Sequence, residues 1–463
     1  MLATIILLFA QIALRPCKIE SVPGLAQCGT YRVWENRTTK QGRHIDLSII
    51  VLNALNAPRE PDPLFMIAGG PGDAPSFNAR FFSQAFANVR EHRDLVLVDL
   101  RGTGKSHPLT CPELADPDPM GVLDADILSV PALRKCRVRL EKSADLRQYT
   151  TEIAVDDLDE VREALGYKQI NLYGTSYGTR VAQVYMRRHP TSLRTVSMKG
   201  VVPASMASPE THARAAEEAW RQLLKRCQND ADCATAFPML SSNLQTLLER
   251  AERGLVIPMK KPTNGASKIK VSKGLFAEAF RFSLYSPEVA ARAPSVIQDL
   301  LNDVTDLGEF VLPTRLLTSN ERLSAGFLLS VSCTEDIPFL PKNLTPLVRG
   351  TFEGDYRLKQ QKNACTVWPR GRVSADHRKP TKSPIPTLLL SGEFDPVTPP
   401  AGGDEVLRGL TQGLHIVIRN NGHPMGSAQD CIGAMIGSFI DKGSVKGVDT
   451  VCASAVASVP FAF

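Results

Sequence analysis

The chain has 463 residues, of which 43% are hydrophobic, so it can bury a large core in one main domain that carries an insertion. Its 54 Lys and Arg residues and 48 Asp and Glu residues give a formal net charge of only +6, without a basic block interleaved with aromatic residues. This pattern excludes a nucleic-acid partner. After the N-terminal segment, no run of about 18 apolar residues predicts a membrane-spanning helix.

The N-terminal segment from Leu2 to Leu14 is apolar apart from Thr4 and Gln11. It is short for a transmembrane helix and has the length of a signal-peptide core. We therefore expect residues 1–26 to be a signal peptide or another N-terminal export segment, cleaved after Ala26. This predicts a secreted, periplasmic or extracellular protein with no membrane contact apart from export. An uncleaved N-terminal anchor and a misassigned start are the alternatives.

Strands are expected at residues 30–35, 43–52 and about 64–68, followed by another at about 94–99. The third runs into Gly69-Gly70-Pro71-Gly72, a loop whose backbone can approach a ligand closely. Because proline has no N–H, a hydrogen-bond donor in this loop must be Gly69 or Gly70, and Gly70 is favoured.

The loop after residue 99 superficially resembles a phosphate-binding loop, since it ends in Gly104, Lys105 and Ser106. That motif needs another glycine five residues before Gly104, and Asp99 stands there, so nucleotide binding is not expected. We expect instead that Asp99 pairs with Arg101 and braces the loop.

A helix is expected over residues 151–165, where apolar residues recur at helical spacing and acids lie near the start. The next apolar run, residues 170–173, leads directly into Gly174-Thr175-Ser176-Tyr177-Gly178. In a Gly-x-Ser-x-Gly motif the serine lies on a sharp strand-to-helix turn that exposes its hydroxyl, and the glycines let neighbouring backbone approach. Ser176 is therefore the candidate nucleophile.

The alternation of strands and helices continues with a helix over residues 177–188 and a strand over 193–200. It predicts an α/β fold with a mostly parallel central sheet and helices on both faces. Residues 27–203 and 384–463 are expected to form the two parts of this core. The 204–383 segment between them is far longer than one crossover needs, so we expect a large, mainly helical lid insertion.

Within the insertion, helices are expected over residues 210–227, 240–251 and 275–301. Ser208 and Pro209 are interpreted as the cap and first-turn proline of the first of these helices. The chain is expected to return to the core near residues 381–384, a polar stretch closed by proline.

Two predicted strands after the insertion each end in a loop with a candidate functional residue. Residues 387–396 are predicted to form a buried strand that ends in a loop carrying Asp395, and His423 follows the strand at 414–418. A serine hydroxyl needs a base, and the base needs a group that orients it. The chain order Ser176, Asp395, His423 is that of the α/β-hydrolases. The amides of Gly70 and Tyr177 would then form the oxyanion hole.

The 10 cysteines include no C-x-x-C and no His-linked metal pattern, so we expect disulfides, no metal and no cofactor. Closure of short loops favours four pairs and leaves a fifth. The pairs are Cys111–Cys136, Cys227–Cys233, Cys333–Cys365, Cys431–Cys452 and, as the remainder, Cys17–Cys28. Cleavage after Ala26 would remove Cys17, so this cleavage site and the fifth pair compete.

The strings Gly-Gly-Pro-Gly, Asp-x-Arg-Gly-x-Gly-x-Ser and Gly-x-Ser-Tyr-Gly-Thr, with the late Asp and Gly-His, resemble the proline iminopeptidase branch of the α/β-hydrolases. Within it, the sequence is most similar to the secreted tripeptidyl aminopeptidase-like group. The resemblance extends over most of the chain after about residue 28. One departure is Ala68, which stands where relatives usually carry His before the paired glycines.

The resemblance implies a serine aminopeptidase that acts on peptides through Ser176, His423 and Asp395. An aminopeptidase must hold the free α-ammonium of its substrate, and Glu335 and Asp336 are the candidates by resemblance and charge. A solvated acidic turn beside a disulfide is at least an equal alternative for these two residues, and Glu210, Glu217 and Glu218 are the alternative binders of the amine. A carboxylesterase acting on small esters or lactones and a non-catalytic binding protein of hydrolase fold are the other hypotheses. No oligomeric state is predicted.

Overall fold

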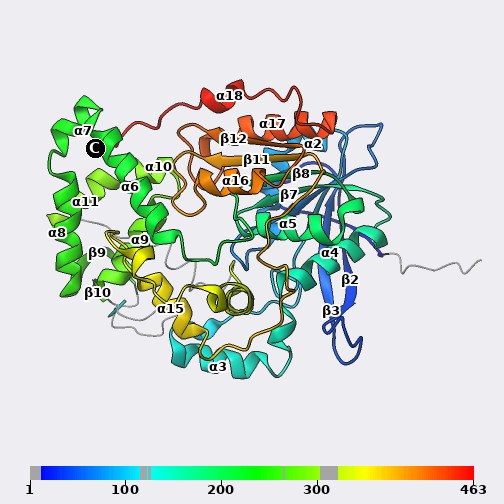
Figure 1. Ribbon diagram of the computed structural model, residues 1–463, viewed down its shortest axis with the longest axis horizontal. Helices are drawn as coiled ribbons and strands as arrows, with labels where there is room; N and C mark the ends of the chain where they lie inside the picture. Colours follow the sequence, from blue (N-terminus) through cyan, green and yellow to red (C-terminus); the bar gives the residue numbers. More distant parts are fainter. Residues whose placement is uncertain (1–11, 115–121, 124–126, 264–265, 303–321, 463) are drawn as a thin grey trace, which may run out of the picture.

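The computed structural model describes residues 12–114, 122–123, 127–263, 266–302 and 322–462. Its centre is a sheet of nine strands in the order β1-β2-β3-β5-β4-β7-β8-β11-β12 (Figure 1). From β5 to β12 neighbouring strands are parallel, whereas β1, β2, β3 and β5 pair antiparallel. The strands are β1 (Arg15–Cys17), β2 (Ala26–Trp34), β3 (His44–Leu52), β4 (Leu64–Ile67), β5 (Leu95–Val98), β7 (Ile170–Thr175), β8 (Leu193–Lys199), β11 (Thr387–Gly392) and β12 (Gly413–Ile418).

Alternate side chains of the central strands pack on opposite faces of the sheet, which is the geometry of an extended chain. Phe65 and Ile67 of β4 join the hydrophobic cluster under α4 (Thr151–Ala164) and α5 (Tyr177–Arg188). Leu64 and Met66 join the opposite cluster under α1 (Ala79–Ala85), α2 (Ala87–Arg90) and α17 (Gln429–Lys442). Figure 1 shows α17 and α2 above the sheet and α4 and α5 below it. The predicted α/β fold is confirmed.

The segment between β8 and β11 is mainly helical and lies to one side of the sheet (Figure 1, green and yellow). Its helices are α6 (His212–Gln228), α7 (Ala231–Ala236), α8 (Leu240–Glu252), α9 (Lys273–Ser283), α10 (Pro287–Ala290), α11 (Ala293–Leu301), α13 (Ala325–Val331), α14 (Thr345–Val348) and α15 (Tyr356–Ala364). Three further helices belong to the flanking parts of the chain, namely α3 (Val130–Leu140), α16 (Pro400–Leu407) and α18 (Val451–Ser454). None of the helices in the described ranges is long and apolar enough to cross a membrane.

Two predictions for the insertion are wrong, and one of its elements was not predicted. Residues 275–301 form α9, α10 and α11 rather than one helix, because Pro287 and Pro294 lack the N–H that a helix interior needs. The first helix begins at His212, so Ser208 and Pro209 lie in turns before it and do not cap it. A hairpin of β9 (Leu255–Thr263) and β10 (Ala266–Val271) was not predicted, and β6 (Val122–Leu123) joins it in a small second sheet.

All five predicted disulfides are present. The pair Cys17–Cys28 joins β1 to β2 at the edge of the central sheet. Cleavage after Ala26 would remove β1 and leave Cys28 single, so that cleavage site and this disulfide exclude each other. Residues 1–11 of the predicted export segment lie outside the described residues, and the segment stays a prediction.

Candidate active site

Ser176 occupies the turn between β7 and α5 in a conformation that is unusual for a non-glycine residue. Its φ is +55° and its ψ is −122°. A positive φ at serine costs free energy and is found where surrounding structure holds the residue for a purpose. A Cβ atom on Gly174 would overlap the carbonyl of Gly178. The local geometry therefore explains the glycines on both sides of Ser176.

Gly178 is expected to tolerate no side chain, because a Cβ there would lie 2.7 Å from the Ile67 carbonyl oxygen and 2.9 Å from that of Ala68. Backbone atoms of β4 cannot move aside cheaply, so Gly178→Ala should lower the free energy of unfolding by about 2–4 kcal/mol. Urea denaturation measures this change. Gly350→Ala is the control for backbone strain alone, because its φ is +73° while nothing lies within 4 Å of its Cβ position, and we expect it to lose only about 1 kcal/mol. An equal loss in both variants would contradict the steric explanation.

Asp395 and His423 form a hydrogen-bonded pair at the ends of β11 and β12. His423 Nδ1 lies 2.8 Å from Asp395 Oδ2, and the side chains are 14% and 0% exposed. The second carboxylate oxygen of Asp395 accepts the N–H groups of Val397 (2.9 Å) and Thr398 (2.8 Å). The hydroxyl of Thr398 donates to Oδ2 at 2.7 Å. The carboxylate is therefore held in one orientation.

Burial by itself would raise the pKa of Asp395, but the charge and hydrogen bond of His423, the Lys199 ammonium and the Thr398 N–H hold this pKa at about 2. Asp395 is thus ionised at neutral pH and can only accept hydrogen bonds. Nδ1 of His423 must carry the proton between them, which leaves Nε2 of the neutral imidazole as an acceptor. This is the tautomer that a general base requires.

The loop of His423 is fixed from two sides. Lys199 Nζ donates to the carbonyl oxygens of Gly422 (2.9 Å) and His423 (3.0 Å). On the other side, the His423 N–H donates to the carbonyl of Tyr285 at 2.8 Å, and the two rings meet edge to face with centroids 5.1 Å apart. Tyr285 follows α9, so the inserted segment directly contacts the candidate base.

A main-chain hydrogen bond places Ser176 at the same edge of the sheet as His423. Its N–H donates to the carbonyl of Lys199 at 2.9 Å, and the next residue, Gly200, lies against the imidazole of His423. Within the described residues no hydrogen bond joins Ser176 Oγ to His423. Such contacts are often long without substrate and tighten when it binds. The structure thus gathers all three predicted residues at the carboxyl ends of neighbouring parallel strands.

The two predicted oxyanion donors lie in loops beside Ser176. A Cβ built on Gly69 would be 3.0 Å from Ser176 Cβ, so the Gly69–Gly70 loop passes directly by the serine. Gly70 has a φ of +107°, and the Gly70–Pro71 peptide bond is cis. Tyr177 is the first residue of α5, where an amide has no partner inside the helix. Both amides are therefore candidates for binding a negative oxygen.

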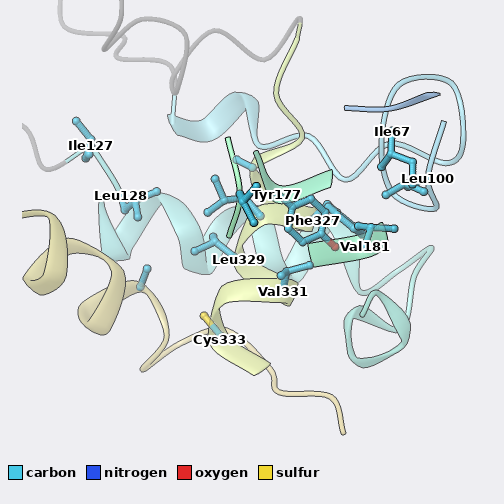
Figure 2. Close-up of a cluster of buried hydrophobic side chains, with 14 of the residues drawn as sticks. Ile67, Leu100, Ile127, Leu128, Tyr177, Val181, Phe327, Leu329, Val331 and Cys333 are labelled. Carbon is cyan, nitrogen blue, oxygen red and sulfur yellow. The ribbon is translucent and has the colours of Figure 1, made fainter. Parts of the chain in front are cut away.

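Helix α13 packs against the start of α5, next to the turn that holds Ser176. Phe327 meets Tyr177 edge to face with ring centroids 6.2 Å apart, and Figure 2 shows it beside Tyr177 and Val181 of α5. The Tyr177 hydroxyl lies 2.8 Å from Thr151 Oγ1. Because all of these side chains except Thr151 belong to the buried apolar core, the start of α5 is rigidly held.

Glu335 and Asp336, the predicted binders of a substrate amine, are buried and already have protein partners. The carboxylate of Glu335 accepts both the N–H and the hydroxyl of Thr151 at 2.6 Å. Asp336 forms an ion pair with Arg180 at 2.8 Å and accepts the Ser208 N–H at 3.0 Å. Burial raises the pKa of both carboxyls, and Arg180 opposes that shift. The alternative of a solvated acidic turn is wrong, since both residues are 1% exposed.

The predicted pairing of Asp99 with Arg101 is wrong. Arg101 is fully buried and pairs with Asp157 of α4 through two hydrogen bonds of 2.6 and 2.9 Å. Asp99 instead accepts the Lys105 N–H (2.9 Å) and the Ser76 hydroxyl (2.8 Å). The partner of Arg101 lies 56 residues away in the sequence. The residues near Arg101 in the sequence therefore do not indicate that Asp157 is its partner.

Three residues that contact the candidate triad were not singled out from the sequence. Thr398 and Tyr285 gave no signal beyond their place in loops. Lys199 gave one, since a lysine at the end of a strand of the predicted central sheet is exceptional in a buried position.

Comparison with known proteins gives two family matches. Residues 62–261 match the family described as "alpha/beta hydrolase fold", and residues 351–452 match the one described as "TAP-like protein". The tripeptidyl aminopeptidase of Streptomyces coelicolor is 25% identical over 464 residues, covering 94% of this chain and 84% of the relative. Serine protease Hip1 of Mycobacterium tuberculosis is 24% identical over 445 residues, covering 86% and 82%.

Shorter and purely structural similarities also occur. A proline iminopeptidase of Neisseria gonorrhoeae is 26% identical over 139 residues, which is 30% of this chain and 32% of that protein. The solved proline iminopeptidase of Mycobacterium smegmatis covers 89% of this chain and 98% of its own, with 16% identity and a TM-score of 0.41. With the sheet order and the two family matches, the chain belongs to the α/β-hydrolases, and the proteins it resembles include ones named tripeptidyl aminopeptidase and proline iminopeptidase.

Proposed function

We propose that this chain is an exported serine aminopeptidase that releases N-terminal residues or short peptides by acyl transfer. The observation that carries the proposal is the buried Asp395–His423 hydrogen bond at the same sheet edge as the strained Ser176 turn. The names of the relatives support a peptide substrate. The five disulfides support an oxidising compartment, secreted or periplasmic.

In the proposed mechanism, Nε2 of His423 takes the hydroxyl proton of Ser176 as its Oγ attacks the scissile carbonyl. Asp395 holds the imidazole and stabilises the imidazolium that forms, while the amides of Gly70 and Tyr177 bind the oxyanion of the tetrahedral intermediate. His423 then gives the proton to the leaving amine. Water repeats these steps on the acyl-enzyme and releases the N-terminal fragment.

The two acidic candidates for recognising the free amine of a substrate already have protein partners. The Glu335 and Asp336 carboxylates already accept hydrogen bonds from Thr151, Arg180 and Ser208, so an amine would have to displace or share these partners. Because of this observation, a carboxylesterase acting on small esters or lactones is the second candidate. The same triad and oxyanion donors serve both reactions.

A comparison of free and N-acetylated substrates tests the aminopeptidase assignment. We expect aminoacyl-, prolyl- and tripeptidyl-amide chromogens to be cleaved only when their N-terminus is free, with kcat/KM reduced at least about 100-fold by acetylation, because an aminopeptidase site pairs the ammonium with a buried acid. Short-chain esters serve as the parallel series. Ester cleavage without amide cleavage would identify an esterase, and equal cleavage of acetylated peptides would contradict an exopeptidase.

A further inference from the structure

Lys199 is a buried cation beside the candidate triad, and the proposed mechanism gives it no role. It is the last residue of β8 and is fully buried. Among the residues that the structure describes, its Nζ donates only to two backbone carbonyls, those of Gly422 and His423. Burying an ammonium group without a contacting carboxylate is costly. A neutral donor could hold two carbonyls at lower cost, so the charge itself needs an explanation.

The contacts of Lys199 join the nucleophile and the base. Its carbonyl accepts the Ser176 N–H at 2.9 Å, while its ammonium holds the His423 carbonyl at 3.0 Å. Gly200, the next residue, has a φ of +68°, and a Cβ there would lie 3.3 Å from Cε1 of the imidazole. The end of β8 thus binds the main chains of both Ser176 and His423. The absence of a side chain at Gly200 leaves room for the imidazole.

The charge of Lys199 acts on the third member of the triad. Burial lowers the pKa of Lys199 to about 8, although Asp395 opposes this shift. The group is therefore mainly an ammonium at neutral pH. In turn its charge helps to lower the pKa of Asp395. The ionisable groups that face Lys199 are Asp395, after β11, and His423, after β12.

We propose that Lys199 is a positioning residue of the triad: the two hydrogen bonds from its ammonium to main-chain carbonyls hold the His423 loop against the strand end that binds Ser176, and its charge stabilises the Asp395 carboxylate. The inference rests on the proposed function, because it assigns a role toward these three residues. A purely structural lysine would affect stability alone. A positioning lysine also affects kcat and the pH dependence of the reaction.

Three variants separate the hydrogen bonds of Lys199 from its charge. All three keep the main-chain hydrogen bond from Ser176. Of the side-chain hydrogen bonds and the charge, Lys199→Arg keeps both, Lys199→Gln keeps a donor without the charge, and Lys199→Met keeps neither. The probe is the rate at which a fluorophosphonate labels Ser176 between pH 5 and 9, together with kcat and KM for a chromogenic ester. The midpoint of thermal unfolding reports on stability, and Ser176→Ala defines the background of labelling.

For Lys199→Met we expect labelling and kcat to fall about 10- to 100-fold with KM unchanged, because a small misplacement of the reacting groups has this effect. Without the cation, the Asp395–His423 pair binds a proton more easily, so the acidic limb of the profile should move up by about one pH unit. Lys199→Gln should show the same movement with a smaller loss of rate. Lys199→Arg should restore the wild-type profile.

If Lys199→Met or, should that variant not fold, Lys199→Gln keeps the wild-type pH profile, the inference is overturned. It is also overturned if a loss of rate merely follows a loss of thermal stability in all three variants. Wild-type protein that is labelled no faster than Ser176→Ala would instead overturn the proposed function, and the inference with it. The two failures are therefore distinguishable.

Discussion

Replacing Ser176 by alanine is expected to lower kcat by about 10⁶-fold, because the only proposed nucleophile is lost and the oxyanion donors and substrate binding alone remain. The residue lies in the strained turn between β7 and α5, half-buried and beside the Gly69–Gly70 loop. Steady-state hydrolysis of the best chromogenic substrate measures the effect. Labelling by a fluorophosphonate should disappear in the same variant.

The fold should not depend on the hydroxyl of Ser176, since within the described residues it takes part in no hydrogen bond. The thermal midpoint of Ser176→Ala should therefore equal that of the wild type, because alanine removes no hydrogen-bond partner and keeps the Cβ, so the strain of the positive φ is unchanged. Residual activity within tenfold of the wild type would show that another nucleophile carries the reaction, and the proposed mechanism would be wrong.

The Asp395→Asn variant is expected to lose about 10⁴-fold in kcat at neutral pH while remaining folded. Oδ1 of Asp395 accepts two backbone N–H groups, from Val397 and Thr398. The carbonyl oxygen of an asparagine must take this position, so its NH₂ group would face His423 Nδ1 and the Thr398 hydroxyl. Nδ1 would then have to accept a hydrogen bond, and Nε2 would carry the proton. The imidazole could no longer accept the proton of Ser176.

A matched control exists in the same domain. His415 Nδ1 lies 2.8 Å from Asp404 Oδ1, in an Asp–His pair whose carboxylate is 64% exposed. Asp404→Asn makes the same chemical change away from Ser176, and we expect it to leave kcat within twofold of the wild type. Comparable losses in both variants would mean that Asp395 acts through general stability, and equal activity of Asp395→Asn and wild type would remove it from the mechanism.

The parts of the fold that could be predicted from the sequence are those with local signals. The helix after Ser176 has the predicted bounds, because the glycine turn fixes its start and the apolar stripe its length. Four of the disulfides followed from closure of short loops, since none of them is separated by more than 32 residues, and Cys17–Cys28 was the pair that remained. The candidate triad residues were found because each follows an apolar strand at a glycine-containing or acidic loop.

The parts that could not be predicted depend on contacts between distant segments. Arg101 pairs with Asp157, and Glu335 binds Thr151 across 184 residues of sequence. The acidic pair next to Cys333 had the right charge for an amine, but only the fold reveals which partners already occupy it. Likewise, the lysine at the end of β8 is recognisable as unusual, while its carbonyl partners lie 223 and 224 residues further along the chain.

The arrangement of the disulfides has a consequence for the biosynthesis of this protein. In chain order, the five bonds close intervals that neither overlap nor nest, with separations of 11, 25, 6, 32 and 21 residues. Each bond thus joins two cysteines that are consecutive in the sequence, and under the proposed export the two would leave a translocation channel one directly after the other. Oxidation in order of appearance gives the native set directly, so a chain that is exported unfolded can complete each crosslink before the following cysteine arrives, without an isomerase having to reshuffle the bonds.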